Sequence, residues 1–111
     1  MVPSLPPSLA SLLERLAGEL QSLYGERYRG LVLFGSYARG EADEGSDVDL
    51  LLLLAGPVNP DREILRIEAI KWPLALEAGL TLSIFPVGQD DYQRGDRLFL
   101  RNARREGVLA A

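Results

Sequence analysis

Residues 30–54 read GLVLFGSYARGEADEGSDVDLLLLL, and this stretch determines the fold that we predict for the chain. Residues 30–34 form a short apolar run bounded by glycine, which predicts a buried β-strand. Residues 47–54 combine two aspartates with five consecutive leucines and predict a second strand. The segment between them is rich in glycine, serine and charged side chains, so we expect a loop with at most one helical turn over 36–39.

Helices are expected on both sides of these two strands. Leucines spaced three and four residues apart over 9–23 indicate an amphipathic helix, and Gly25 stands where that helix would end. Asn59 followed by proline is a typical start for a second helix, with asparagine as N-cap. Pro73 is expected to kink or end this helix near Trp72, because proline lacks the backbone N–H that the helix needs, and Gly79 closes the segment.

The remaining residues predict a third strand over 81–87 and a last helix. This helix opens at an aspartate and ends in arginines before Gly107, as helix C-termini prefer. The expected order is therefore α-β-β-α-β-α. It predicts a small α/β (α+β) domain over residues 1–111, with a three-stranded mixed sheet packed on helices.

Composition excludes several classes of site. The 111 residues include no cysteine and no histidine, which removes disulfides, thiolate and imidazole metal sites, and histidine-based catalysis. The net charge of −4 argues against nonspecific nucleic-acid binding, because such binding depends on neutralising phosphates. The start of the chain does not resemble a signal peptide, and the leucine run is too short to cross a bilayer. We therefore expect a soluble, cytoplasmic protein with no membrane association.

Asp47 and Asp49 are the first candidate functional residues. Side chains alternate along a strand, so both carboxylates lie on one face, and Val48 lies on the other. Two carboxylates on one partly dry face repel each other unless a positive charge lies between them. Mg²⁺ selects carboxylate oxygens, and substrate phosphates usually complete its coordination shell. The pair alone would be weak support for a metal site, since an aspartate after serine can also belong to a simple turn.

The end of the first strand supplies groups of the opposite kind. Gly35 permits a sharp turn and a close approach of a ligand to the backbone. Ser36 offers a hydroxyl and a backbone N–H, and a helical turn beginning there would attract anions. Arg39 is within reach of phosphate oxygens or of the neighbouring carboxylates. If the two strands pair, phosphate donors and metal ligands meet at one edge of the sheet.

The segment GSYARGEADEGSDVDL, residues 35–50, resembles the signature of the polymerase-β-like nucleotidyltransferase superfamily. That signature is Gly-Ser, ten residues, and Asp-x-Asp, and the Arg-Gly at 39–40 matches its smaller members. The whole chain is similar to the minimal nucleotidyltransferases. The resemblance implies ATP as substrate, with Mg²⁺ held by Asp47 and Asp49, and its phosphates contacted by Gly35 and Ser36. It further implies transfer of a nucleoside monophosphate with release of pyrophosphate.

One part of the family pattern is missing. The family has a third carboxylate on a later strand, and the corresponding position here is Ser83 or, as the alternative, Thr81. Neither residue is a carboxylate, and a hydroxyl is a poor Mg²⁺ ligand and no base at neutral pH. Asp43, Glu44 and Glu77 are other acids that could substitute for it.

Three functions from different classes follow. The first is an enzyme that transfers AMP to a hydroxyl of a protein; the resemblance suggests a HEPN-type toxin partner, with this chain as antitoxin. The second is a degenerate module that binds nucleotide or partner without transfer, because the third carboxylate is missing. The third is a structural subunit whose acidic pair has no role.

Overall fold

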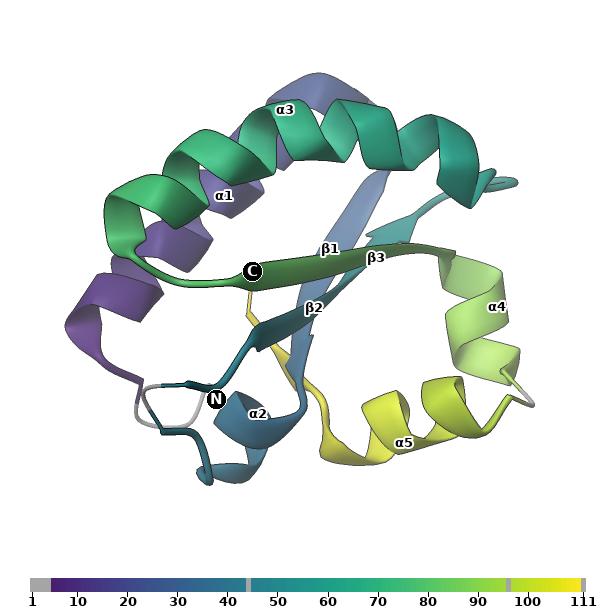
Figure 1. Cartoon of the computed structure of the whole chain (residues 1–111). Helices are drawn as coiled ribbons and strands as arrows, with labels where there is room; N and C mark the ends of the chain where they lie inside the picture. The colour runs from purple at the N-terminus through teal and green to yellow at the C-terminus, as the bar shows by residue number, and fades with distance from the viewer. Residues whose placement is uncertain (1–4, 44, 96, 111) are drawn as a thin grey trace.

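The computed structural model describes residues 5–43, 45–95 and 97–110. Figure 1 shows its elements, which follow one another as α1 (Pro7–Tyr24), η1 (Gly25–Arg27), β1 (Tyr28–Phe34), α2 (Ser36–Arg39), β2 (Val48–Leu54), α3 (Pro60–Ala78), β3 (Leu82–Gly88), α4 (Gln89–Arg94), α5 (Leu98–Glu106) and β4 (Val108–Leu109). In the described part of the chain, no helix is both long and apolar enough to cross a membrane.

The strands form one mixed sheet in the order β3-β2-β1-β4. β1 pairs antiparallel with β2 and with β4, whereas β2 and β3 are parallel. The prediction of a mixed sheet packed on helices is confirmed for the three long strands. The prediction missed β4, because two residues carry no readable periodicity, and it merged α4 and α5 into one helix.

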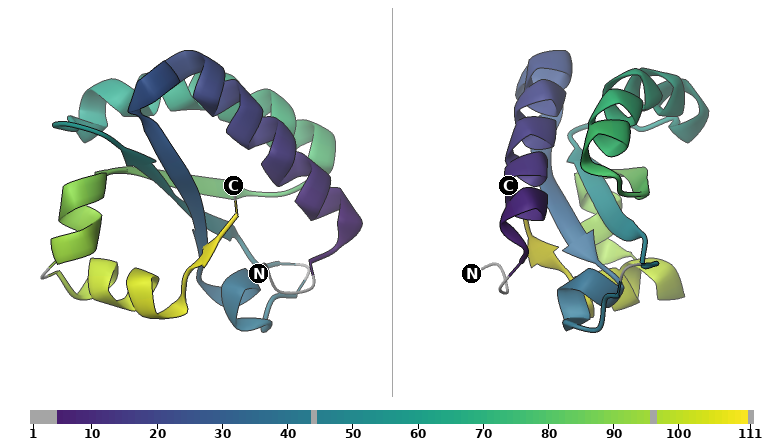
Figure 2. Two further views of the ribbon diagram at one scale, coloured as in Figure 1. Left: turned by 180° about the vertical axis from the view of Figure 1, so that it is seen from behind. Right: turned by 60° about the vertical axis from the view of Figure 1, so that its left-hand side comes forward.

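Helices α1 and α3 cover one face of the sheet, and Figure 2 shows them side by side above it. Leu50, Leu52 and Leu54 point toward these helices and are fully buried among their leucines and isoleucines. Leu51 and Leu53 point to the opposite face, where they contact residues of α5. The run of five leucines therefore supplies both faces of a central strand, as a strand buried on both sides requires.

Helix α3 passes through Pro73 and continues to Ala78, so the alternative that the helix ends near Trp72 was wrong. The ring removes one intrahelical hydrogen bond, and the turns on either side remain packed on the sheet and on α1. The predicted ends of the helix are confirmed. The Asn59 side chain accepts a hydrogen bond from the Asp61 N–H at 3.1 Å, and Gly79 adopts the left-handed conformation at the C-cap.

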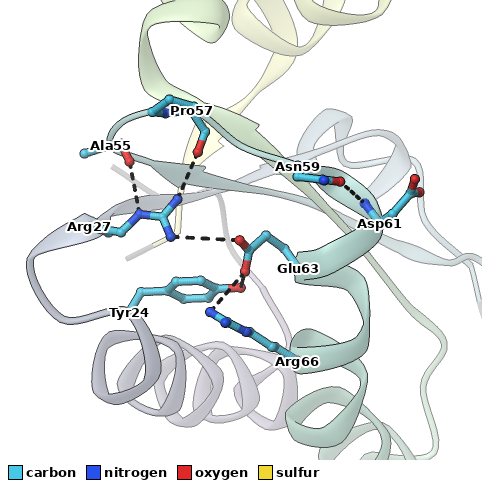
Figure 3. A network of polar contacts seen from close by, with 8 residues as sticks. All are labelled: Tyr24, Arg27, Ala55, Pro57, Asn59, Asp61, Glu63 and Arg66. Atoms are coloured by element: carbon cyan, nitrogen blue, oxygen red, sulfur yellow. Dashed lines mark hydrogen bonds and ion pairs between the residues drawn. The ribbon is translucent and has the colours of Figure 1, made fainter.

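A buried ionic cluster joins α1 to α3 (Figure 3). The Glu63 carboxylate is only 3% exposed, and it accepts a hydrogen bond from the Tyr24 hydroxyl at 3.0 Å. Arg66 lies 3.6 Å and Arg27 lies 3.9 Å from the carboxylate oxygens of Glu63. Arg27 also donates to the backbone carbonyls of residues 55 and 57. The cluster ties both helices to the loop that follows β2, at the end of the sheet remote from Asp49.

Candidate active site at the edge of the sheet

Asp49 lies on the face of the sheet that is turned away from α1 and α3. Its neighbours Val48 and Leu50 are buried in the core beneath those helices, and side chains alternate along a strand. Asp49 is therefore directed toward the face that α5 only partly covers, where it is half-buried. Asp47 precedes the strand and is exposed. The two carboxylates share the edge at which β2 begins, as the sequence indicated.

Gly35, from the glycine–serine part of the motif, lies next to the two aspartates. Phe34 is the register partner of Asp49 across the β1–β2 ladder, so Gly35 follows directly beside the carboxylate. Its backbone has φ +76° and ψ −155°, a conformation that is essentially restricted to glycine. A Cβ atom added at Gly35 would overlap a carboxylate oxygen of Asp49. Glycine is thus required twice, for the turn and for the contact with Asp49.

The helical turn α2 begins at the next residue, Ser36. The first backbone N–H groups of a helix have no intrahelical acceptor, so they are available to an anion. Because Gly35 touches Asp49, these N–H groups lie next to the carboxylates. The structure therefore brings together Gly35, Ser36, Asp47 and Asp49, four of the predicted site residues.

The electrostatics of the pair match the predicted repulsion. Burial raises the pKa of the Asp49 carboxyl above its usual range, and the negative charge of Asp47 raises it further. The positive charge of Arg39 acts in the opposite direction and lowers this pKa. Both raising effects would be relieved by a cation between the two carboxylates.

Arg39 is engaged with carboxylates other than the aspartate pair. Its guanidinium is 3.2 Å from Glu41 and 3.1 Å from Glu106 of α5, and these two partners raise its own pKa. Contact between Arg39 and a phosphate stays a prediction, and it requires that the phosphate replace at least one of these acidic partners.

Ser83 occupies the place beside Asp49 on the adjacent strand. The two residues are register partners in the parallel β2–β3 ladder, so their side chains share one face. Thr81 lies outside the strand, and its carbonyl accepts the Val48 N–H at 2.8 Å. Ser83 is therefore the better of the two positions proposed for a third site residue.

The substitute acids do not complete the site. Asp43 accepts hydrogen bonds from Gly45 and Ser46 within its own turn. Glu77 pairs with Arg15 at 3.2 Å on the layer formed by α1 and α3, which covers the other face of the sheet. Glu44 lies outside the described residues. Within residues 5–43, 45–95 and 97–110, no group of three acidic, histidine or cysteine side chains could hold a metal ion.

The two aspartates nevertheless suit one magnesium ion that is also coordinated by the phosphates of a nucleotide. Mg²⁺ is typically bound by one or two protein carboxylates, with waters and substrate phosphates as further ligands. Asp47 and Asp49 could supply the two carboxylates, and a cation between them would relieve their mutual repulsion. Ser83 adds no strong ligand for a second ion.

Three phenylalanines gather on the face of the sheet that carries Asp49, and the sequence did not predict this cluster. The rings of Phe34, Phe85 and Phe99 come from β1, β3 and α5, and their centroids are 5.5–6.2 Å apart. The alternation of side chains along a strand could have predicted that Phe85 shares a face with Ser83, because the two residues are two positions apart. The position of Phe99 depends on how α5 folds back, for which the sequence holds no local signal.

Comparison with known proteins identifies the family. Residues 13–84 match the family model described as a nucleotidyltransferase domain, which is more than half of the chain. The chain belongs to this nucleotidyltransferase family. The resemblance first seen in residues 35–50 is thereby confirmed.

The match to named relatives of the nucleotidyltransferase covers only part of each of them. It is 42% identical over 74 residues to a bifunctional uridylyltransferase/uridylyl-removing enzyme of Thiobacillus denitrificans, covering 63% of this chain and 9% of that protein. It is 35% identical over 46 residues to a candidate protein adenylyltransferase of Methanocaldococcus jannaschii, covering 41% of this chain and 46% of that protein. The chain thus matches less than half the length of these relatives.

Solved structures confirm the fold. A candidate minimal nucleotidyltransferase superposes with a TM-score of 0.58 at 26% identity, covering 91% of each chain. A toxin–antitoxin structure with AMP-PNP gives 0.61 at 19% identity, covering 88% of this chain and 72% of the other. A tri-AMPylated HEPN toxin of Shewanella oneidensis in complex with its MNT antitoxin gives 0.54 at 19% identity, covering 92% and 71%.

Proposed function

We propose that this nucleotidyltransferase transfers a nucleoside monophosphate, AMP from ATP, to a hydroxyl of a protein acceptor in a Mg²⁺-dependent reaction. The observation that carries the proposal is the contact of Gly35 with the Asp49 carboxylate. It joins a turn suited to phosphates and a carboxylate pair suited to Mg²⁺ at one edge of the sheet.

In the proposed reaction, the acceptor oxygen forms a bond to the α-phosphorus of ATP. The bond between that phosphorus and the bridging oxygen of pyrophosphate breaks, pyrophosphate leaves, and the hydroxyl proton passes to water at the open edge. A bound magnesium ion would neutralise charge on the phosphates and on the leaving group. Asp47 and Asp49 would hold that ion, and the backbone at Ser36 would orient the phosphates.

We further propose that the acceptor is a HEPN-type toxin and that this chain acts as its antitoxin. The support is a likeness of fold to the MNT antitoxin in complex with an AMPylated HEPN toxin, together with the sequence relation to a candidate protein adenylyltransferase. The antitoxin likeness is at 19% identity, so the partner and the acceptor residue belong to the proposal.

A second candidate is a module that binds nucleotide and partner without transferring AMP. The specific observation in its favour is Ser83, a hydroxyl that stands beside Asp49 where the resemblance implies a carboxylate. Both candidates predict binding of MgATP, and only the first predicts turnover.

Two measurements separate these candidates. Calorimetry should detect MgATP binding that is lost in Asp47→Asn and Asp49→Asn and kept in the control Glu77→Gln, whose side chain lies on the opposite layer. Equal affinity in all four proteins would reject the site. Labelled ATP incubated with a co-purified HEPN partner then tests transfer. Label on the partner supports the enzyme, whereas its absence with any divalent metal, followed by its appearance in Ser83→Asp, supports the binding module.

A further inference from the structure

The order of the strands fixes the side from which an acceptor can reach the metal. This step rests on the proposed function. β2 carries Asp49 and lies between β1, which leads into the phosphate-binding turn, and β3, which is an edge strand. An in-line displacement places the attacking and leaving oxygens on opposite sides of the phosphorus. If pyrophosphate leaves toward α2, the acceptor must arrive on the β3 side.

On that side the chain presents aromatic surface immediately after Ser83. Phe85 lies two residues further along the same face of β3, and Phe99 of α5 packs against it with a centroid distance of 5.7 Å at 71°. Both side chains remain 43% exposed although they contact each other. Rings that serve only to close a core would be covered more completely, so this pair can receive another side chain.

The aromatic surface continues into a groove. A cavity of about 620 Å³ lies between the end of β3, α4 and the start of α5, and Phe99 is one of its lining residues. Val87 and Leu100 give it an apolar floor. The cavity reaches the face of the sheet that carries Asp49, because Leu100 belongs to the core cluster on that face and Val87 packs against it.

The lining of the groove also includes two basic side chains. Arg94 and Arg97 both line it, together with one carboxylate, that of Asp91. Arg94 donates from Nε to the backbone carbonyl of Asp90, and neither arginine forms an ion pair with a carboxylate in the described part of the chain. Although the net charge of the chain is −4, these two guanidinium groups are therefore available to pair with carboxylates of a partner.

We propose that this groove binds the protein acceptor. The residue that carries the acceptor hydroxyl lies against Phe85 and Phe99 with its oxygen toward Ser83, and an acidic residue of the same segment pairs with Arg94 and Arg97. A nucleobase is a poorer occupant, because it is uncharged and makes no use of two arginines, while the triphosphate is held on the α2 side.

The test uses the protein loaded with MgAMP-PNP and two synthetic peptides, Ac-Glu-Glu-Gly-Tyr-Gly-Glu-Glu-amide and its counterpart with lysine in place of every glutamate. NMR titration of the ¹⁵N-labelled protein reports where and how tightly each peptide binds. The acidic peptide should shift the amide signals of β3 and of the first turn of α5. It should bind at least about tenfold more tightly than the basic peptide, because like charges at an interface are strongly disfavoured.

Variants make the test specific. Arg94→Glu combined with Arg97→Glu should reverse the preference between the peptides, which a merely structural role of the arginines would not do. Phe85→Leu should weaken the acidic peptide several-fold and leave MgAMP-PNP affinity unchanged. The control is Trp72→Leu on α3, whose side chain is 54% exposed and remote from the groove, and it should change neither affinity.

Three results would overturn the proposal. Peptide signals that shift elsewhere or not at all would remove the groove as the acceptor site, and so would an unreversed charge preference. A loss of MgAMP-PNP affinity in Phe85→Leu would make the ring a nucleobase platform instead. Failure of the proposed function is seen separately, as MgAMP-PNP binding that is absent from the wild type or indifferent to Asp47→Asn.

Discussion

The substitution Tyr24→Phe tests the buried ionic cluster that holds α1 on α3. It removes one hydroxyl and leaves the ring, which is 7% exposed, in place. The Glu63 carboxylate then loses the donor at 3.0 Å and keeps Arg66 and Arg27 at 3.6 and 3.9 Å. Hydrogen bonds to charged groups contribute about 1.5–3 kcal/mol, so we expect a loss of about 2 kcal/mol in the free energy of unfolding at pH 7. For 111 residues this lowers Tm by about 9 °C.

The pH dependence gives a second signature of the same hydrogen bond. Burial, followed by the hydrogen bond to Glu63 and its charge, raises the pKa of Tyr24 from 10.0 to about 12. Below pH 10 the phenol is neutral in both the folded and the unfolded state, and its contribution is fully present. Between pH 10 and 12 only the unfolded state ionises, so the wild type loses stability as pH rises. Tyr24→Phe has no such loss, and the two proteins should converge in this window.

Urea unfolding at pH 7 and at intervals from pH 9 to 12 measures both effects. The matched control is Tyr92→Phe, since the Tyr92 hydroxyl has no hydrogen-bond partner among the described residues; its cost at pH 7 should stay within about 0.5 kcal/mol. The reasoning is refuted if Tyr24→Phe costs no more than Tyr92→Phe at pH 7. It is equally refuted if the deficit of Tyr24→Phe stays constant up to pH 12.

Three further predictions concern the candidate active site. Gly35→Ala should cost about 1–3 kcal/mol of stability, because its backbone conformation is essentially glycine-only, and calorimetry should show loss of MgATP binding as Asp49 is displaced. Asp49→Asn should unfold at higher urea than the wild type at pH 7, and this gain should vanish at pH 3. Burial and the charge of Asp47 raise the pKa of Asp49 in the folded state, so ionisation of this carboxyl above pH 3.8 disfavours the folded state. Glu106→Gln should change the free energy of unfolding by less than about 0.5 kcal/mol, as for other exposed ion pairs. The variant should bind MgATP more tightly than the wild type, because Arg39 then has one acidic partner fewer and can contact a phosphate. Unchanged affinity would show that Arg39 does not contact the nucleotide.

The sequence predicted the strands and main helices because their signals are local. Leu51 and Leu53 could be assigned to a buried strand without knowing what covers them, since a run of leucines is compatible with either face. Asn59 and Gly79 marked the ends of α3 through capping chemistry, which depends on a few adjacent residues. The short β4 depends on pairing with β1, which no local pattern encodes.

In the candidate active site, too, the features encoded by nearby residues could be predicted and those that depend on distant residues could not. Gly35, Asp47 and Asp49 could be placed together because the motif lies within one hairpin, where register follows from neighbouring strands. Ser83 could be proposed because it shares a strand pattern with Leu82 and Ile84. The ion pair of Arg39 with Glu106 joins residues 67 positions apart, so it follows only from the way α5 returns to α2.

Asp49 lies on the same face of the sheet as the core cluster that contains Leu51, Leu53 and Leu100, and aromatic side chains lie between them. Phe34 and Phe85 reach over β2 from the two flanking strands, next to the carboxylate on one side and Leu51 on the other. Phe34 is the residue directly opposite Asp49 across the ladder, which is consistent with burial being the largest cause of the raised pKa of Asp49. A substitution that shrinks Phe34 would therefore both loosen the packing of α5 and hydrate Asp49. Stability and metal affinity should therefore change together in a Phe34 variant, whereas a substitution of Asp47, whose side chain is exposed, should change metal affinity with little effect on stability.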